Sequence, residues 1–181
     1  MLILASGSPR RHELLKAAGI AHIVRPVTVR QNRRPGESPL TLVKRLASEK
    51  AHKAERKPDD VVLGADTEVC VGNDVFGKPS DEEDARRMLR MLSGRDHWVH
   101  TGVCIVTGET KIVDVASTKV SFLDLTDEEI AEYTRSGEPF GKAGGYAIQG
   151  LASKFVRSIE GCYHNVVGLP VSLVYEHLKS L

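Results

Sequence analysis

The feature that most restricts the fold of this chain is a regular alternation of strand-like and helix-like segments. Most strand-like segments are enriched in β-branched residues, and they cover residues 2–5, 21–25, 61–65, 68–71, 98–106 and 118–123. The helix-like segments cover residues 9–18, 39–55, 81–92, 127–134 and 170–180. This order predicts an α/β protein with a mixed sheet. Two helix starts also carry the pattern of a capping box, Ser80 with Glu83 and Thr126 with Glu129.

The first strand-like segment runs into a turn of small residues that is followed by two arginines. Ser8 stands where a helix N-cap belongs, so the turn from Ser6 to Ser8 should direct backbone N–H groups at an anion. Arg10 and Arg11 would oppose the helix dipole unless an anion lies beside them. We therefore predict an anion site here, in preference to the alternative of simple capping and solvated arginines.

The charge balance restricts the partners of the chain. Its 181 residues include 25 Lys and Arg against 24 Asp and Glu, and the formal net charge of +1 predicts no bulk attraction to nucleic acid or to an anionic membrane. The sequence shows no signal-peptide pattern and no apolar run of transmembrane length, so we expect a cytoplasmic protein with no membrane partner. Its three cysteines have no paired spacing, which favours reduced thiols over disulfides or a zinc site.

A lysine stands on the apolar stripe of the helix-like segment at residues 39–55. Lys50 follows Leu46 and Ala47 by four and three residues, which places it on the inner face of that helix. One interpretation is that its ammonium snorkels to the surface. The other is that Lys50 binds the same anion as Arg10 and Arg11.

A carboxylate follows the buried strand predicted at residues 61–65. Asp66 would lie at the carboxyl end of that strand, where ligand sites of α/β sheets form, and is a candidate general base or metal ligand. The alternative is a turn-capping Asp whose neighbour Thr67 bonds to the backbone. Lys78, in a loop before a helix, is a weaker candidate, and the glycine-rich residues 137–150 form a candidate functional loop.

Together these segments resemble the Maf family of nucleoside triphosphate pyrophosphatases over nearly the whole chain. The matching motifs are Leu4-Ala-Ser-Gly-Ser-Pro-Arg-Arg11, Arg45-Leu-Ala-Ser-Glu-Lys-Ala51, Gly64-Ala-Asp-Thr67, Gly77-Lys-Pro79, Leu92-Ser-Gly-Arg-Asp-His97, Thr101-Gly-Val103, Lys142-Ala-Gly-Gly-Tyr-Ala-Ile-Gln-Gly150 and Asn165-Val-Val-Gly-Leu-Pro170. The resemblance implies a distant relation to the inosine triphosphate pyrophosphatases. It also implies one domain over residues 1–181, with a mixed twisted sheet flanked by helices and two lobes around a central cleft.

The resemblance implies a hydrolase of acid anhydrides that cleaves a nucleoside triphosphate between its α and β phosphates. It assigns Asp66 as the proton acceptor that activates water. The residues present suit this chemistry, because Arg10, Arg11, Lys50 and Lys78, with the backbone donors from Ser6 to Ser8, would neutralise a triphosphate and stabilise the leaving pyrophosphate. A divalent cation, Mg²⁺ or Mn²⁺, would assist, with Asp66 as one ligand. Homodimers are common among proteins of this kind, so we also expect a homodimer.

The resemblance further assigns residues to the substrate and points to the branch of the family that acts on dTTP and UTP. The residues it assigns are Ser6, Ser8 and Arg11 for the phosphate chain and Arg10, Thr67 and Gln149 for the choice of base. The amide of Gln149 can donate and accept at once, which suits the imide edge of uracil or thymine. Modified pyrimidine triphosphates are also candidate substrates.

The chain departs from the family pattern at two places. Arg30-Gln31 stands where most relatives carry an acidic pair, and one of those acids is regarded as part of the active site. Gln31 can still ligate a metal through its carbonyl but without charge, so we predict weaker metal binding than a Gln31→Glu variant would show. Gly141 replaces the aspartate that is common before Lys142-Ala-Gly, and we expect this position to set only the backbone shape of its loop.

Two other functions are alternatives to this enzyme. One is a nucleotide-binding regulator of septum formation and cell division with weak residual hydrolysis, because the family is linked to septum inhibition and Gln31 weakens the acidic site. The other is nucleic-acid binding through Arg30, Arg33 and Arg34, which is disfavoured because a short basic loop without aromatic neighbours is usually just solvated.

Overall fold

A mixed seven-stranded sheet forms the framework of the computed structural model, which describes residues 1–181. The strands are β1 (Leu2–Leu4), β2 (Ile23–Val24), β3 (Val61–Val71), β4 (Asp74–Phe76), β5 (Asp96–Val106), β6 (Lys111–Phe122) and β7 (Val156–Glu160). Their order is β2-β1-β3-β5-β6-β7, and β4 pairs with β3. β1 is parallel to β2 and β3, whereas β4 and β7 pair antiparallel with their neighbours, so the predicted α/β class with a mixed sheet is confirmed.

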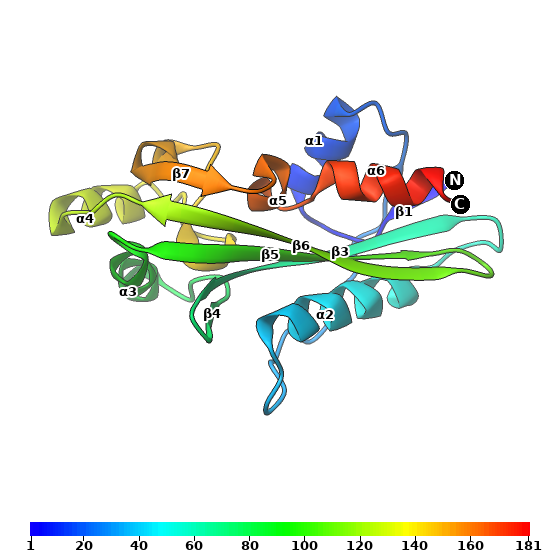
Figure 1. Cartoon of the computed structure of the whole chain (residues 1–181), viewed down its shortest axis with the longest axis horizontal. Helices are drawn as coiled ribbons and strands as arrows, with labels where there is room; N and C mark the ends of the chain where they lie inside the picture. Colours follow the sequence, from blue (N-terminus) through cyan, green and yellow to red (C-terminus); the bar gives the residue numbers. More distant parts are fainter. The chain divides into compact units, whose positions relative to one another are not determined.

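Helices follow most of the strands along the chain (Figure 1). The α-helices are α1 (Pro9–Ala17), α2 (Pro39–Lys53), α3 (Glu82–Leu92), α4 (Asp127–Arg135), α5 (Tyr163–Val167) and α6 (Val171–Lys179), and the 3₁₀ helices are η1 (Ala143–Gly145) and η2 (Leu151–Phe155). None of them combines the length and apolar composition that a crossing of a bilayer requires.

The chain divides into two compact units, which we describe separately. Unit 1 comprises Met1–Thr67, Thr101–Ala116 and Gly168–Leu181, and unit 2 comprises Glu68–His100 and Ser117–Val167. β3, β5 and β6 contribute residues to both units. The chain therefore passes between the units four times, through continuous strands as well as through the residues that precede α6.

In unit 1, alternate residues of the strands pack against helices on opposite faces of the sheet. Leu4 and its neighbours on one face pack against Leu15 of α1 and Val174 of α6. Ala5 and its neighbours on the other face pack against α2 through Ala47 and Ala51. In Figure 1 α2 accordingly lies on one side of these strands, and α1 and α6 lie on the other.

Two glycines let α2 approach this part of the sheet closely. A Cβ atom on Gly64 of β3 would lie 2.2 Å from the backbone oxygen of Ala47, and one on Gly102 of β5 would lie 2.3 Å from that of Val43. Any side chain at these positions would displace the helix. These two positions therefore fix the depth at which α2 is seated, and with it the place of Lys50.

In unit 2, aromatic side chains form much of the interior. His97 of β5 packs edge-on against Phe122 and Tyr146, whose own ring centroids are 4.9 Å apart. Phe155 of η2 packs on Phe122 and on Tyr133 of α4. This cluster connects β5 and β6 to the segment that contains residues 137–150.

The structure corrects several predicted boundaries. The strands predicted at residues 61–65 and 68–71 are one strand, β3, so Asp66 lies in its middle and not at its carboxyl end. The parallel neighbour β1 ends before this point, because its last residue, Leu4, pairs with Leu63. The amide of the next residue, Ala5, donates to the oxygen of Leu63 at 2.8 Å. β3 therefore continues through Asp66 beyond the last residue of β1 that pairs with it.

Other differences concern short elements and one cap. The strand predicted at residues 21–25 is only Ile23–Val24, and the short strands β4 and β7 have too few residues for a periodic signal. The capping box at Thr126 is confirmed, whereas α3 is capped by Asp81, whose side chain accepts from the amide of Asp84. An aspartate adjacent to Ser80 thus takes the cap that the sequence pattern gave to the serine.

Candidate active site

A buried ion pair joins α2 to β3 inside unit 1. Lys50 Nζ donates to Asp66 Oδ1 at 2.5 Å and to the backbone oxygen of Ala65 at 3.3 Å. Only 9% of the Lys50 side chain and 4% of the Asp66 side chain are exposed. The helical stripe thus placed Lys50 correctly, and the alternative of a lysine that snorkels to the surface is wrong.

The second carboxylate oxygen of Asp66 has no hydrogen-bond partner although it is buried. Leaving a buried carboxylate oxygen unsatisfied is costly, and native proteins do so chiefly where the group has a chemical role. Lys50 compensates part of the negative charge through Oδ1 and leaves Oδ2 open. Asp66 Oδ2 is therefore suited to accept a proton, a water molecule or a metal ion.

Arg11 forms a buried hydrogen-bond network around the end of β1. Its Nε donates to the oxygen of Gly168 at 2.8 Å, and its Nη1 donates to Ser6 Oγ at 3.0 Å and to the oxygen of Ala65 at 2.9 Å. Its Nη2 donates to Thr67 Oγ1 at 3.0 Å. Arg11 thus holds the turn after β1 against the two residues that flank Asp66, through the backbone of Ala65 and the side chain of Thr67. The assignment of Arg11 to the phosphate chain stays a prediction, and the structure adds this positioning role.

The hydroxyl of Thr67 belongs to the same network. Thr67 Oγ1 lies 2.9 Å from Thr101 Oγ1 and 3.3 Å from the oxygen of Gly168, to which it can donate. Sequence reasoning missed Thr101 and Gly168 as members of the site. Both lie in motifs that carried the family resemblance, which was the only signal for them in the sequence.

The turn from Ser6 to Arg10 leads into the N-terminus of α1, and the anion site expected there stays a prediction. Ser8 occupies the N-cap position of α1 with an extended backbone, but its side chain caps no amide. Its own amide donates instead to Ser6 Oγ at 3.3 Å, and Ser6 is buried. Arg10 is half-buried in the first turn of the helix.

The remaining predicted site residues lie outside this cluster. Gln31 is exposed in the segment between β2 and α2 of unit 1. Lys78 is exposed after β4, and Gln149 is exposed between η1 and η2, both in unit 2. The structure therefore brings Ser6, Arg11, Lys50, Asp66 and Thr67 together within unit 1.

The segment that carries Gln31 is tied to α2 by a bidentate ion pair. Arg45 donates to both carboxylate oxygens of Glu37, at 2.6 and 2.9 Å, and also to the oxygen of Asn32 at 3.1 Å. The hydrogen bonds from Arg45 lower the pKa of Glu37 to about 2, and Glu37 in turn raises the pKa of Arg45. Because α2 also carries Lys50, this pair couples the position of the segment to the site.

A second buried pair holds the loop that carries Gln149. His97 Nε2 lies 2.7 Å from the hydroxyl of Tyr146, three residues before Gln149. Burial lowers the pKa of His97 to about 4 and raises the pKa of Tyr146, so both groups are neutral near pH 7. Glu138 closes the other side of the loop by accepting from the amide of Leu151 at 2.9 Å.

The side chains present can accommodate a divalent cation only in part. No group of three or more His, Cys, Asp or Glu residues is arranged so that it could hold a metal ion. Mg²⁺ is usually held by one or two carboxylates, with water and substrate phosphates as its other ligands. Asp66 Oδ2 meets the first requirement, because it is an anionic oxygen with no hydrogen-bond partner. The donor set therefore fits a metal that shares its ligands with a phosphate chain.

Comparisons with known proteins agree with the sequence motifs. A family model described as "Maf-like protein" matches residues 1–181. A protein of Koribacter versatilis named "dTTP/UTP pyrophosphatase" is 49% identical over 98% of this chain and 93% of its own length. Proteins with the same name from Geobacter sp. and Bacillus cereus are 49% and 46% identical, and each comparison covers 98% of this chain and 94% of the relative.

One solved structure supports the fold. The Staphylococcus aureus Ham1 protein superposes with a TM-score of 0.57 at 12% identity, over 99% of this chain and 98% of its own. At this identity the likeness concerns the fold alone.

Proposed function

Because the chain belongs to the Maf family, we propose that it hydrolyses dTTP and UTP to the nucleoside monophosphate and pyrophosphate. The relatives that carry the name "dTTP/UTP pyrophosphatase" support this activity. The observation that carries the proposal is the buried Lys50–Asp66 pair with its open carboxylate oxygen. Such a group suits general base catalysis on water.

In the proposed reaction, Asp66 Oδ2 accepts a proton from a water molecule. The water oxygen bonds to the α phosphorus, the bond from that phosphorus to the bridging oxygen breaks, and pyrophosphate leaves with the electron pair. Lys50 keeps Asp66 oriented through Oδ1, and Arg11 holds Ala65 and Thr67 on either side of it. A bound Mg²⁺ or Mn²⁺ would neutralise phosphate charge, with Asp66 and the carbonyl of Gln31 as its protein ligands.

The other predicted residues complete this proposal. Ser6, Ser8, Arg11 and Lys78 would bind the phosphate chain, since cations and N–H donors stabilise the charge that develops on the leaving pyrophosphate. Arg10, Thr67 and Gln149 would select the base. Modified pyrimidine triphosphates are further candidate substrates.

We also propose that residues 1–181 act as one functional domain and that the protein is a cytoplasmic homodimer. Its role would be to remove unwanted pyrimidine triphosphates from the nucleotide pool. A single domain is supported by the family match over the whole chain and by three strands that belong to both units. The dimer would be recognised by the mass of the purified protein in solution.

A panel assay tests the proposal. Pyrophosphate release from dTTP, UTP, dCTP, GTP and ATP would be measured with Mg²⁺ and with Mn²⁺, for the wild type and for Asp66→Asn and Gln149→Glu variants. We expect dTTP and UTP to rank first for the wild type. The Gln149→Glu variant should change this ranking, because an ionised carboxylate only accepts hydrogen bonds. An unchanged ranking would contradict the assignment of Gln149, and release no faster than that of Asp66→Asn would favour the cell-division regulator.

A further inference from the structure

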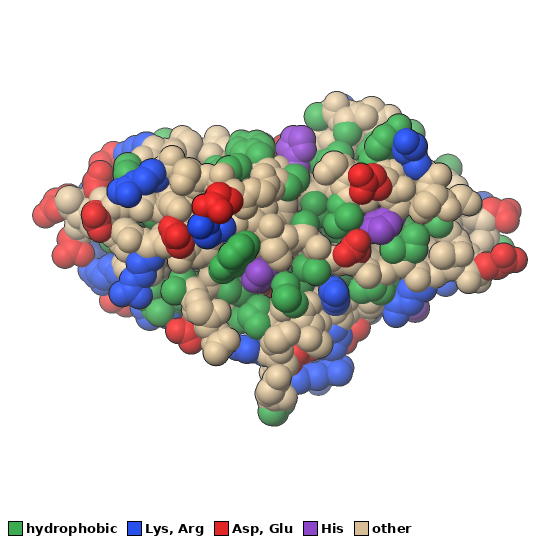
Figure 2. Space-filling model, viewed as in Figure 1, with side chains coloured by type: hydrophobic (Ala, Val, Ile, Leu, Met, Phe, Trp, Pro, Cys, Tyr) green, Lys and Arg blue, Asp and Glu red, His purple; other side chains and the backbone are tan.

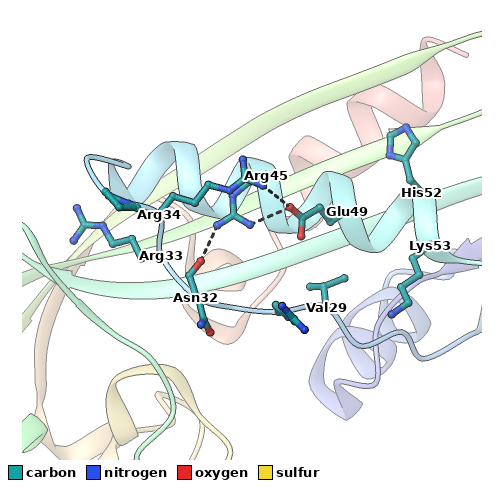
Figure 3. Close-up of a pocket in the computed structure, with 10 residues that line it drawn as sticks. Val29, Asn32, Arg33, Arg34, Arg45, Glu49, His52 and Lys53 are labelled. Carbon is teal, nitrogen blue, oxygen red and sulfur yellow. Dashed lines mark hydrogen bonds and ion pairs between the residues drawn. The ribbon is translucent and has the colours of Figure 1, made fainter.

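A second group of basic side chains in unit 1 lies apart from the Lys50–Asp66 pair and lines a pocket of about 830 Å³ (Figure 3). We call it the basic pocket. One wall is the segment between β2 and α2, with Arg30, Arg33 and Arg34, and the other wall is the outer side of α2, with Arg45, Glu49 and Lys53. Neither Lys50 nor Asp66 lines it.

The charge of the basic pocket is far from balanced. Its lining has five Arg and Lys side chains and a single carboxylate, that of Glu49. Glu37, behind the lining, is bonded to Arg45 on both of its oxygens and compensates one more cation. The whole chain has a formal net charge of only +1, so the excess of three positive charges at this place is local. Lys and Arg side chains are also gathered along the lower edge of the face in Figure 2, near the segment that leads into α2.

The walls of the basic pocket are held by hydrogen bonds that do not use all of its cations. Arg45 links the walls by donating to the oxygen of Asn32, and it also donates to Glu49 on its own wall, as Figure 3 shows. Lys53 Nζ donates to the oxygen of Thr28 at 2.6 Å across the same gap. Figure 3 shows Lys53 extending from α2 toward this part of the segment. The pocket thus keeps its form without a ligand.

Two arginines remain for a ligand. Arg30 is exposed and lines the pocket, and its guanidinium has no ion pair within the chain. Arg34 has a single long ion pair, 3.5 Å from Glu49, and 66% of its side chain is exposed. A guanidinium presents a planar fork of N–H donors that matches the oxygens of a phosphate.

We propose that the basic pocket is a second anion site that binds condensed phosphates, either free pyrophosphate or the phosphate chain of a nucleotide. A local excess of three positive charges matches such a multiply charged anion better than a monoanion. Along α2, Lys50 then pairs with Asp66, whereas Lys53, three residues later, lines the basic pocket. The proposal concerns binding only and does not depend on hydrolysis.

Calorimetric titration with inorganic pyrophosphate tests the basic pocket. The protein variants are Arg30→Gln/Arg34→Gln and a matched control, Arg87→Gln/Arg90→Gln, which removes the same charge from exposed positions of α3. We expect the wild type and the control to bind at one more site than the pocket variant, or to bind about tenfold more tightly. The difference should shrink at high salt, because the pocket is open to solvent.

Further titrations identify the source of the phosphate and keep the test decisive. Stronger binding of dTTP or dTMP than of pyrophosphate would assign the pocket to nucleotides, which the proposal includes. Equal pyrophosphate binding by all proteins, or binding of a single-stranded oligonucleotide in preference to both, would overturn it. A parallel loss of kcat/KM for dTTP in the pocket variant would overturn it too, by making the pocket part of the catalytic site. If the double variant fails to fold, an Arg30→Glu variant repeats the comparison. The titration tests binding at the basic pocket even if the protein hydrolyses no triphosphate.

Discussion

At the scale of the residue, Lys50 and Asp66 are charged groups that have both lost most of their contact with water. Their mutual attraction offsets part of the desolvation cost. The hydrogen bonds that Lys50 donates to Asp66 and to the oxygen of Ala65 offset a further part. The open oxygen of Asp66 is the one feature of this pair that structural stability does not require.

The Asp66→Asn variant tests Asp66 as the base, and its stability is measured beside its kinetics because the change also removes the charge that pairs with the buried Lys50. We expect kcat for dTTP to fall by about 10²- to 10⁴-fold with little change in KM, because an amide cannot accept the proton from water. Steady-state kinetics would be compared with Asp59→Asn, an exposed aspartate shortly before the same strand, which should keep wild-type kcat. Full turnover by Asp66→Asn would move the base to another residue.

Arg11 differs from an ordinary phosphate-binding arginine because four hydrogen bonds tie it to the protein. In an Arg11→Lys variant a single ammonium cannot reach all of these acceptors, so we expect the free energy of unfolding to fall by about 2 kcal/mol. Denaturant titration would be compared with Arg10→Lys, which should change stability much less. If Arg11 served only the substrate, its variant would raise KM and leave stability unchanged.

At the scale of the element, the position of α2 depends on the absence of side chains from the strands beneath it. Gly64 and Gly102 face Ala47 and Val43, and the helix is seated there by backbone contact with neighbouring strands. Lys50 follows Ala47 by less than one turn, so the depth of the helix sets the distance from its ammonium to Asp66.

The Gly64→Ala variant tests this dependence. Its methyl group would meet the oxygen of Ala47 at 2.2 Å, so α2 must move outward, and we expect a stability loss of about 1–3 kcal/mol with a lower kcat. Thermal unfolding and kinetics would be compared with Gly77→Ala, where a Cβ meets no atom within 4 Å. Equal stability and kcat for both variants would show that α2 is seated by other contacts.

At the scale of the whole molecule, two groups with lowered pKa values make stability depend on pH. The unfolded chain binds a proton at His97 below pH 6.5, but burial delays this in the folded chain to about pH 4. Glu37 takes its proton near pH 4.5 when unfolded but near pH 2 when its hydrogen bonds with Arg45 are formed. In both windows the unfolded state binds more protons, so stability falls as pH falls.

We therefore expect the free energy of unfolding to decrease from pH 6.5 to pH 4 by up to about 1.4 kcal/mol per pH unit because of His97. Denaturant titrations across this range would measure the slope for the wild type and for a His97→Gln variant, in which it should flatten. His164→Gln, at an exposed position, serves as the control and should keep the slope. A slope that His97→Gln leaves intact would assign the acid sensitivity to other groups.

The parts of the fold that sequence reasoning predicted are those determined by neighbours along the chain. The starts of α1, α2 and α4 agree with the structure, because Ser8, Ser38 and Thr126 stand at their N-cap positions. Lys50 was placed on the inner face of its helix by the spacing of apolar residues alone. In each case the signal lies within a few residues of the position predicted.

The parts that were missed or misplaced depend on distant contacts. The segment Asp66-Thr67-Glu68 has little strand propensity, yet it continues β3, where Arg11 and Thr101 bond to it from other elements. β7 has a mostly exposed pattern and exists because it pairs with β6. The basic pocket is likewise formed by α2 and a segment without regular structure.

The sequence by itself determined the α/β class, the family, the choice of Asp66 and Lys50 as candidate site residues, and the helix from which the lysine comes. Only the tertiary structure decided that Asp66 lies within a strand beside the end of β1, with one oxygen paired and one open. It also decided that Arg11 holds the backbone around that aspartate and that three arginines meet α2 in a pocket. The reason is physical: helix periodicity and capping act between near neighbours, whereas burial, ion pairing and local charge excess arise only when distant segments meet.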